Sequence, residues 1–384
     1  MRATLLLLLL ISCQLPAATV FEIRDPVGDD HGSGDLLYPN RGDLQPGDLD
    51  IVSFAAENEA GGTWFQAEFR NPIRTPQSEV TEVGQVPMPR LARNGFYSFN
   101  IDIYIDQDLE PGSGLTEALP GRKVRIDAAT AWEKTVLLTP RPDIARSMLA
   151  SHLERIREQE LRAEQGRVTG DDRERIAAAV EQTLTERYFM PNRVRVRRRV
   201  IRFFVPEEFL GGPASRDWAY TVLITGAEVE QTTRLATAPE NFLLMNLPVE
   251  RGLNFRNFGL RGDADADQPP VVDYVMPRAG WQRIRLSDYN VARGLYASVV
   301  GTVPSGRPLD VKPRAYEDTA QPPAAEERSR AEAPPREADR GEAEPIPTGD
   351  SLADQLRAIR ELRDQGLLTE EEYQTIRRRL LAEY

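Results

Sequence analysis

The sequence is poor in the residues from which most catalytic and metal centres are built. It contains one cysteine, Cys13, and two histidines, His31 and His152. A disulfide within the chain needs two cysteines, a zinc site usually needs several Cys or His ligands, and a Ser-His-Asp triad needs a suitable histidine. The sequence therefore excludes an internal disulfide and the usual kind of zinc site, and it indicates that the 384 residues fold around a packed core.

An excess of positive charge is also missing. The chain has 60 acidic and 48 basic residues, a formal net charge of −12 and a pI near 5.0. Because phosphate backbones attract basic surfaces, nucleic acid is not expected as a partner. Cationic partners, or partners of no marked charge, fit this balance better.

One apolar run stands out, at residues 5–11, and it is too short to span a bilayer as a mature helix. Arg2 precedes it and small residues near Ala17 follow it, which is typical of an export signal over residues 1–19. Two processing sites remain open: the four residues that end at Cys13 resemble the lipobox of bacterial lipoproteins, whereas a signal peptidase could cut near Ala17. Both predict an extracytoplasmic protein, periplasmic or associated with the cell envelope, with membrane contact only through a lipid on Cys13.

Strand and turn patterns fill most of residues 20–305. Alternation is clearest at 96–105, where apolar residues such as Phe99 and Ile103 share one face and polar residues such as Asp102 share the other, so we expect a half-buried strand. Further strands are predicted at 50–54, 63–69, 193–196, 200–205, 218–225 and 271–275.

Two segments break this pattern. At about 143–190 the apolar period becomes helical, which predicts a helical hairpin inserted into the β region, as a structural elaboration or alternatively as a partner-binding element. Residues 306–350 are rich in Ala, Pro, Glu and Arg and poor in large apolar residues, which predicts a disordered, charged linker.

The last segment, residues 351–384, has the pattern of a second helical hairpin. Ser351 is a natural N-cap, Gly366 supplies a stop, and Thr369 with Glu372 completes a capping box. Two helices this short bury little surface on their own. We therefore expect the apolar stripes to dock onto a second copy, another protein or a membrane surface, through Leu352, Leu356, Ile359, Leu362, Tyr373, Ile376 and Leu380.

This segment resembles the SHOCT (short C-terminal) domain. The resemblance rests on residues 352–356, on 362–373 (LRDQGLLTEEEY) and on the leucines at 380–381. It implies a small interaction or oligomerisation module without catalytic activity.

The β region, about residues 20–301, resembles the C-terminal domain of glucodextranase. Two stretches carry the resemblance. The first is residues 25–34 (DPVGDDHGSG), followed by 38–39 and 46–50, and the second is 104–106, 112–122 (GSGLTEALPGR) and 131–133. A weaker third stretch lies at 205–206, 211, 218–220 and 272–274. The resemblance implies a jelly-roll-like β-sandwich related to carbohydrate-binding modules, with an α-glucan-like polysaccharide as partner. In those enzymes the catalytic domain is a separate helical barrel, for which this chain has no room, so no enzymatic activity is expected.

Two acidic loops could hold calcium, which is the only cofactor that we expect. Calcium accepts several oxygen ligands in flexible geometry, and nearby glycines permit tight wrapping. The alternative is that these aspartates cap turns on solvated loops. The candidate ligands are Asp25, Asp29, Asp30, Asp106 and Asp108.

Other side chains leave alternatives open. Four alternating arginines, from Arg193 to Arg199, could bind an anionic glycan or a lipid headgroup, pair with the acidic linker, or face water. Tryptophans such as Trp64 could stack on sugars, although aromatic residues in strands usually pack in the core. Nothing selects an acid and a nucleophile for glycoside hydrolysis among so many carboxylates.

The sequence therefore favours an exported, non-catalytic, carbohydrate-binding-like protein that docks through its C-terminal hairpin. The alternative is a cell-envelope scaffold or assembly factor that binds protein rather than sugar. A glycoside hydrolase is the least favoured function.

Overall fold

A computed structural model describes residues 19–34, 36–38, 44–76, 82–83, 86–87, 92–227, 259–260, 268–309 and 311. For 82–83, 86–87 and 259–260 it describes only the backbone. The chain divides into two units, 1–323 and 324–384, and every described residue belongs to the first. The predictions for the export signal, Cys13 and the C-terminal hairpin fall outside the described residues, as does nearly all of the predicted linker.

The first of two five-stranded sheets is antiparallel throughout. Its third and fourth strands show why these segments are strands, since apolar side chains such as Phe65 and Phe203 alternate with outward-facing polar ones. In spatial order the strands are β1 (Thr19–Arg24), β3 (Ile51–Glu59), β4 (Gly62–Phe69), β12 (Val200–Pro206) and β11 (Val194–Arg197).

The second sheet mixes one parallel pair with three antiparallel pairs. The spatial order is β10 (Tyr188–Phe189), β9 (Lys134–Leu138), β7 (Phe99–Asp106), β13 (Ala219–Gly226) and β15 (Val271–Tyr274). The parallel pair joins β10 to β9, and the central strand, β7, forms eight register pairs with β13.

The two sheets pack face to face around one aromatic core. Phe54 and Phe65 of the first sheet stack with ring centroids 5.6 Å apart, and each lies 6.2 Å from Tyr220 of the second sheet. Phe69 similarly meets Phe99 across the interface at 4.8 Å. The fold is therefore mainly β and has the two-layer arrangement of a β-sandwich.

Strand β7 corrects one expectation from the sequence. Both of its faces are buried, so it is not half-buried: Ile103 lies in the sandwich core, while Asp102 and Tyr104 on the opposite face are 0% and 1% exposed. That face is covered by a second apolar cluster, which includes Trp132 and Leu149. The sequence pattern missed this layer because polar residues on a covered face look the same as polar residues in water.

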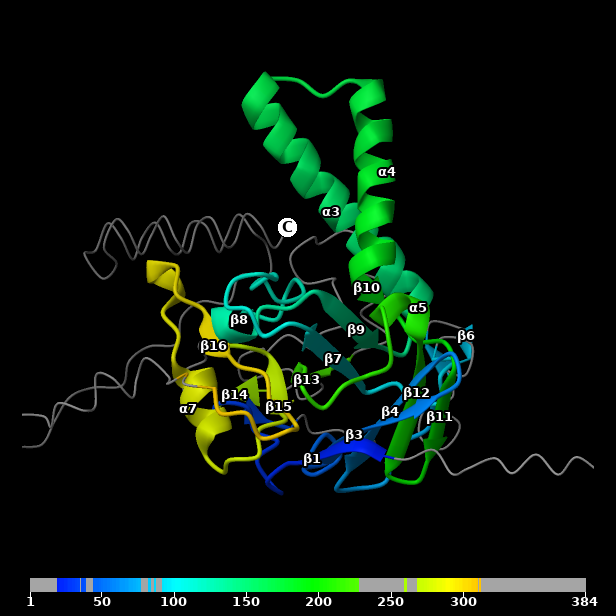
Figure 1. The fold of residues 1–384 in the computed structure, drawn as a ribbon, viewed down its shortest axis with the longest axis vertical. Coiled ribbons are helices and arrows are strands. Elements are labelled where there is room, and N and C mark those ends of the chain that lie inside the picture. Colours follow the sequence, from blue (N-terminus) through cyan, green and yellow to red (C-terminus); the bar gives the residue numbers. More distant parts are fainter. Residues whose placement is uncertain are drawn as a thin grey trace, which may run out of the picture. The chain divides into compact units, whose positions relative to one another are not determined.

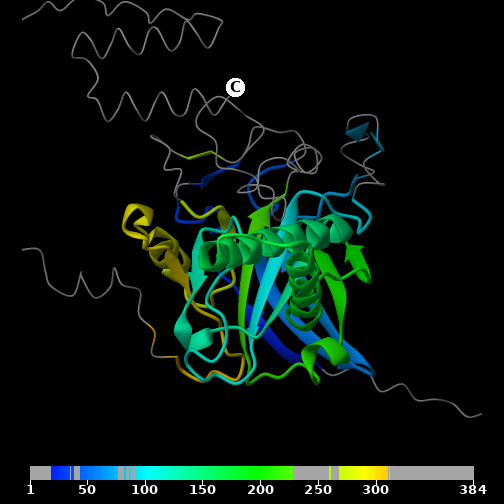
Figure 2. The same ribbon diagram turned by 90° about the horizontal axis from the view of Figure 1, so that it is seen from above.

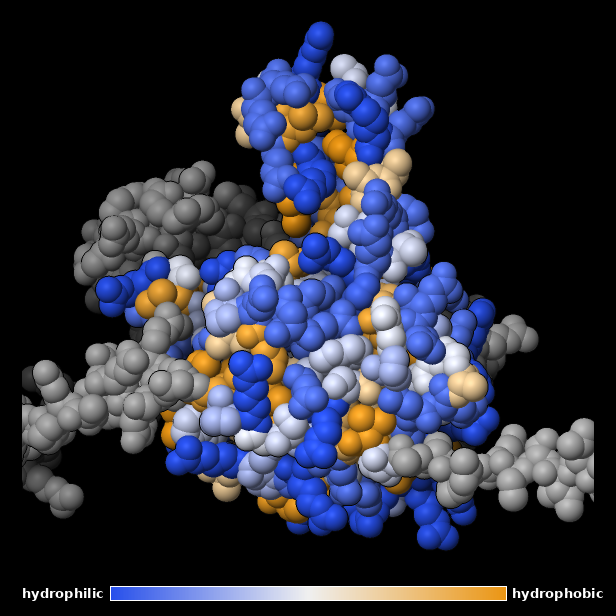
Figure 3. Space-filling model, in the orientation of Figure 1, coloured by the Kyte–Doolittle hydropathy of each residue, from blue (hydrophilic) through white to orange (hydrophobic). Residues whose placement is uncertain are grey.

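The inserted helices are α3 (Pro142–Gln165) and α4 (Gly170–Arg187), at the predicted position. Thr169 and Asp172 form the capping box that starts α4. The buried apolar residues of the hairpin, such as Leu149 and Leu184, lie at one end of it. Figure 1 shows the rest projecting from the sheets, and Figure 2 shows the two helices in front of the sheets when the molecule is seen from above. Figure 3 shows mostly hydrophilic side chains on the hairpin, with apolar ones between the helices.

Short elements complete the described part of the chain. Helix α7 (Trp281–Ser287) and strand β9 were not predicted, because seven and five residues carry too little periodicity. No helix in the described ranges has the length and apolar character needed to cross a membrane. The other elements are β2 (Leu36–Leu37), β5 (Glu82–Val83), β6 (Val86–Pro87), β8 (Val124–Ile126), η1 (Ala128–Thr130), α5 (Glu207–Leu210), β14 (Gly259–Leu260), η4 (Val291–Arg293) and β16 (Ala297–Val299).

Candidate functional site

Four aspartates from distant parts of the chain meet where the two sheets join. Asp25 follows β1, Asp29 lies in the glycine-rich loop after it, Asp50 precedes β3 and Asp273 lies in β15. Backbone amides hold them in place: Met276 donates to Asp25 Oδ1 at 2.6 Å, and the amide of residue 51 donates to Asp273 Oδ2 at 2.7 Å. We call these four residues the carboxylate cluster.

The glycine-rich loop is tied closely to β15. The amide of Gly32 donates to the carbonyl of Val272 at 2.8 Å, and Gln282 Nε2 donates to the carbonyl of Asp29 at 2.5 Å. Gly32 has φ +57°, and a Cβ atom there would lie 2.6 Å from the carbonyl oxygen of Val271. Only glycine permits this close approach. Gly32 therefore allows the loop to pack against β15, which places the aspartates of the loop in the cluster.

Three carboxylate oxygens in the cluster are buried without a hydrogen-bond partner. They are Asp25 Oδ2, Asp29 Oδ1 and Asp50 Oδ1. Asp25 is 7% exposed, whereas Asp50 and Asp273 are 0% exposed. One oxygen each from Asp25, Asp29 and Asp273 lies within 4.8 Å of the others. Calcium binds oxygens at about 2.3–2.6 Å, so ligands of one ion lie up to about 5 Å apart, and this donor set fits the ion.

Burial also makes the ionised cluster unfavourable by itself. Desolvation, with repulsion from neighbouring aspartates, raises the pKa of Asp29 and that of Asp50 to about 6. The pKa values of Asp25 and Asp273 are raised well above the ordinary range, chiefly by desolvation and also by mutual repulsion within the cluster. At neutral pH the cluster therefore needs either protons or a cation to compensate its charge.

Asp30 does not join the cluster, although the sequence analysis grouped it with Asp25 and Asp29. Its Oδ2 accepts hydrogen bonds from the hydroxyl of Tyr38 and, at 2.7 Å, from the amide of Gly47. Asp30 is 1% exposed, so it fixes the loop from inside. Burial, followed by the neighbouring Asp30 carboxylate, raises the pKa of Tyr38 well above its usual range.

A second acidic group lies at the end of β7. Asp106, Asp108 and Glu133 bring oxygens within 4.8 Å of one another, and the inner oxygens Asp106 Oδ2 and Glu133 Oε1 are buried without a partner. Burial raises the pKa of Asp106 and that of Glu133. Asp108 is exposed, and it also accepts from the hydroxyl of Ser113 at 2.9 Å. The group is therefore more open to solvent than the carboxylate cluster.

Sequence reasoning found part of each acidic group and missed Asp50, Asp273 and Glu133. Each of the three lies in or beside a stretch that resembles the glucodextranase domain, which was the available signal. No spacing rule links them, because the amide-to-carboxylate bond at Asp25 joins residues 251 positions apart.

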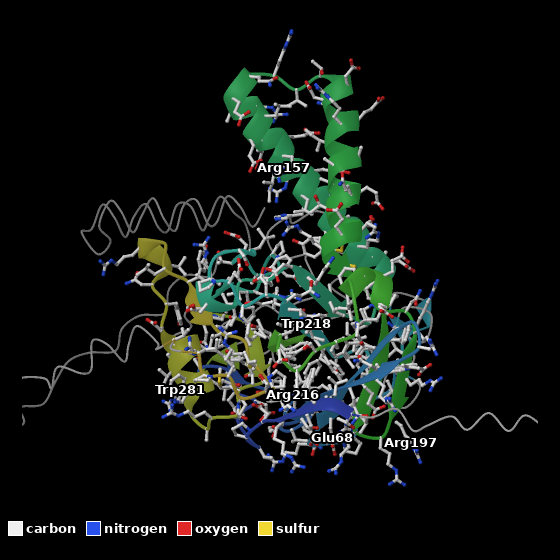
Figure 4. All side chains as sticks on the ribbon, in the orientation of Figure 1. Glu68, Arg157, Arg197, Arg216, Trp218 and Trp281 are labelled. Carbon is white, nitrogen blue, oxygen red and sulfur yellow. The ribbon has the colours of Figure 1, made fainter. Side chains whose placement is uncertain are left out.

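The tryptophans do not form one sugar-binding platform. Trp64 and Trp132 are 4% and 1% exposed, as expected for core residues. Trp218 and Trp281 are partly exposed, but Figure 4 shows them well apart, on the segment before β13 and on α7. The arginines from Arg193 to Arg199 are exposed at one edge of the first sheet. Their predicted alternation along one strand ends at Arg197, because Arg197 is the last residue of β11.

Comparison with known proteins agrees with this architecture. Residues 20–301 match the family described as the C-terminal binding module, SLH-like, of glucodextranase, and residues 354–381 match the short C-terminal domain (SHOCT). No curated protein matches the chain. The first match covers both sheets, the inserted helices and the carboxylate cluster. The chain therefore belongs to the family of the C-terminal binding module of glucodextranase, and it carries a SHOCT segment near its C-terminal end.

Proposed function

We propose that this protein is a non-catalytic carbohydrate-binding module that acts outside the cytoplasm, with calcium organising its N-terminal loop. The family match supports the binding function, because its description is that of a binding module of glucodextranase. The partner that we propose is an α-glucan-like polysaccharide. Export is supported by the apolar run at residues 5–11 and the small residues after it.

The observation that carries the calcium site is the set of buried, unpartnered oxygens in the carboxylate cluster. Asp25, Asp29 and Asp273 would hold the ion, and Asp50 lies beside them with an unpartnered oxygen of its own. A bound calcium ion would supply the positive charge that these carboxylates lack. The amides of Met276 and Gly28 orient Asp25 and Asp50, so the residues need little rearrangement to accept it. Asp106, Asp108 and Glu133 form a second, more open candidate.

The same geometry argues against glycoside hydrolysis at the carboxylate cluster. A glycosidase needs two carboxylates on opposite sides of a substrate bond, in a cleft that admits the sugar. Asp25, Asp50 and Asp273 are each at least nine-tenths buried, and they hold the sheet junction together. A sugar has no access to them.

We further propose that the C-terminal segment assembles the protein. Its match to SHOCT and the apolar stripes of residues 351–384 support self-association or docking onto a protein partner. One observation favours the second candidate function, a cell-envelope scaffold that binds protein: helices α3 and α4 project from the sheets with most of their surface exposed (Figure 1).

Binding of the full-length chain to immobilised amylose and dextran tests the carbohydrate function, with and without calcium. We expect binding to at least one glucan, stronger with calcium than with EDTA. The variant Asp50→Asn should show a smaller calcium effect than the wild type, whereas the exposed control Asp217→Asn should keep the full effect. Absence of glucan binding in both conditions would reject the carbohydrate function and leave the scaffold function as the better account.

A further inference from the structure

The outer face of the first sheet carries a hollow lined mostly by arginines. It has a volume of about 570 Å³, within the range of ligand sites. Figure 4 shows Arg197 at the edge of the sheet, with its side chain directed away from the strands. We call this hollow the arginine groove, and its lining residues are Gln66, Arg195, Arg197, Arg198, Arg199, Val200 and Arg202.

Positive charge in the groove is only partly compensated. Arg199 pairs with Glu68 at 2.9 Å, and Arg202 pairs with Glu57 at 2.5 Å. Arg195, Arg197 and Arg198 have no acidic partner among the described residues, and all three are exposed. Three unpaired positive charges are therefore concentrated on one face of a chain whose net charge is −12.

The strands hold these arginines together against their mutual repulsion. Arg195 lies directly opposite Arg202 in the register of β11 and β12, a placement that disfavours like charges. Both guanidinium groups lie over the ring of Trp64, at 4.8 Å and 5.5 Å from its centroid. This cation–π contact fixes their positions before any ligand arrives.

The turn at the end of the groove has a backbone conformation that is unfavourable for arginine. Arg198 follows β11 with φ +55°, a conformation that glycine or asparagine adopts more readily in a two-residue hairpin turn. Amides of Phe69 and Ile73 donate to the carbonyls of Arg199 and Arg198 at 2.8 Å and hold the turn in place. The fold therefore holds Arg198 in a conformation that is unusual for its residue type, next to the other arginines of the groove.

The chemistry of the groove selects among anionic ligands. All its cationic residues are arginines, whose planar guanidinium groups form paired hydrogen bonds with carboxylates and with phosphates. The large apolar side chains exposed in the described ranges are Val27, Ile284, Leu295 and Tyr296, none of which lines the groove, so a lipid surface lacks an apolar anchor there. Trp64 is 4% exposed and cannot stack on nucleic-acid bases.

We infer that the arginine groove binds an acidic polysaccharide through the carboxylates of its sugar units. This inference rests on the proposed carbohydrate-binding function and adds a second, charge-selective surface to it. Gln66 supplies an uncharged hydrogen-bonding group beside the arginines, which suits sugar hydroxyls. The groove lies on the first sheet alone and uses no residue of the carboxylate cluster.

The test compares binding of the full-length chain to polygalacturonate and to amylose by calorimetry. The variant Arg195→Gln/Arg197→Gln should bind polygalacturonate at least about tenfold more weakly, because it loses charge-assisted hydrogen bonds at two positions. The matched control Arg167→Gln/Arg293→Gln removes two exposed arginines elsewhere and should bind as the wild type does. The variant Arg195→Lys/Arg197→Lys, which keeps the charge, should recover part of the affinity.

Each outcome separates the inference from the function on which it rests. Binding to amylose without binding to polygalacturonate would overturn the inference alone, and so would equal affinity in the two Arg→Gln variants with unchanged thermal unfolding. Failure to bind either polysaccharide would overturn both. Tighter binding to phosphatidylglycerol vesicles or to duplex DNA than to polygalacturonate would assign the groove to another ligand and overturn the inference.

Discussion

Asp102 and Arg122 form a doubly hydrogen-bonded ion pair in which both side chains are completely buried. Arg122 Nε donates to Asp102 Oδ2 at 2.5 Å, and Arg122 Nη2 donates to Oδ1 at 2.9 Å, with both side chains 0% exposed. Asp102 lies on the outer face of β7, and Arg122 ends the 112–122 stretch that resembles the glucodextranase domain. The pair therefore attaches that stretch to the second sheet.

Removing one member of this pair should destabilise the fold strongly. We expect Arg122→Met to lower the free energy of unfolding by about 3–5 kcal/mol, because it leaves the Asp102 carboxylate buried without its cation. The double variant Asp102→Leu/Arg122→Met should be more stable than Arg122→Met, since it leaves no buried charge. Urea unfolding followed by circular dichroism measures both. A double variant as unstable as the sum of its single variants would show that the charges do not act as a pair.

Calcium should stabilise the protein through the carboxylate cluster. We expect a higher midpoint of thermal unfolding in calcium than in EDTA, because an ion that binds only the folded state adds to its stability. Asp50→Asn removes one repelling charge, so it should raise the midpoint in EDTA and reduce the gain from calcium. Asp217→Asn, at an exposed position, serves as the control. Identical midpoints in calcium and EDTA for the wild type would contradict the site.

The cation-free protein should lose stability as pH rises from about 4 to about 6. The pKa of Asp29 and that of Asp50 are raised from 3.8 to about 6 in the folded state, so the folded state binds more protons in this interval. Their stabilising effect is complete below pH 4 and declines above it, by up to about 1.4 kcal/mol per pKa unit for each group. Unfolding in EDTA across this range should show a steeper decline for the wild type than for Asp50→Asn. Equal slopes would contradict the raised pKa of Asp50.

Gly32 should tolerate no side chain. A Cβ atom there would meet the carbonyl oxygen of Val271 at 2.6 Å, in addition to the cost of φ +57°. Gly61 has φ +84° with nothing within 4 Å of the corresponding Cβ position, so Gly61→Ala reports the backbone cost alone. We expect Gly32→Ala to lower the free energy of unfolding by about 1–3 kcal/mol more than Gly61→Ala does. Similar losses in the free energy of unfolding for the two variants would mean that the loop moves at little cost to make room for the Cβ atom.

Deletion of residues 351–384 should lower the oligomeric state of the protein or release a bound partner. The apolar stripes predicted for this segment need a covering surface, and its SHOCT match supports that role. Light scattering on the full-length and truncated chains gives their masses, and Leu356→Asp/Leu380→Asp repeats the test without truncation. An unchanged mass together with an unchanged set of co-purified proteins would reject docking through this segment.

Local patterns in the sequence predicted where most strands and both inserted helices lie. The sequence predicted β4, β7, β12 and β13 to within a few residues. Alternation of apolar and polar residues was clearest for β7, because side chains alternate along an extended strand. The change to a helical period at about residues 143–190 likewise predicted the position of α3 and α4. Short elements such as β9 and α7 escaped, since a few residues fit several patterns equally well.

The sequence by itself determined the order of the elements, the glycine-rich loop with its aspartates and the row of arginines, since backbone geometry sets these patterns within a few residues. Only the tertiary structure decided that Asp273 joins Asp25 and Asp29, that Asp30 turns away to Tyr38, and that both faces of β7 are covered. The physical reason is that such contacts join residues far apart in the chain, and the packing of one sheet on the other brings them together.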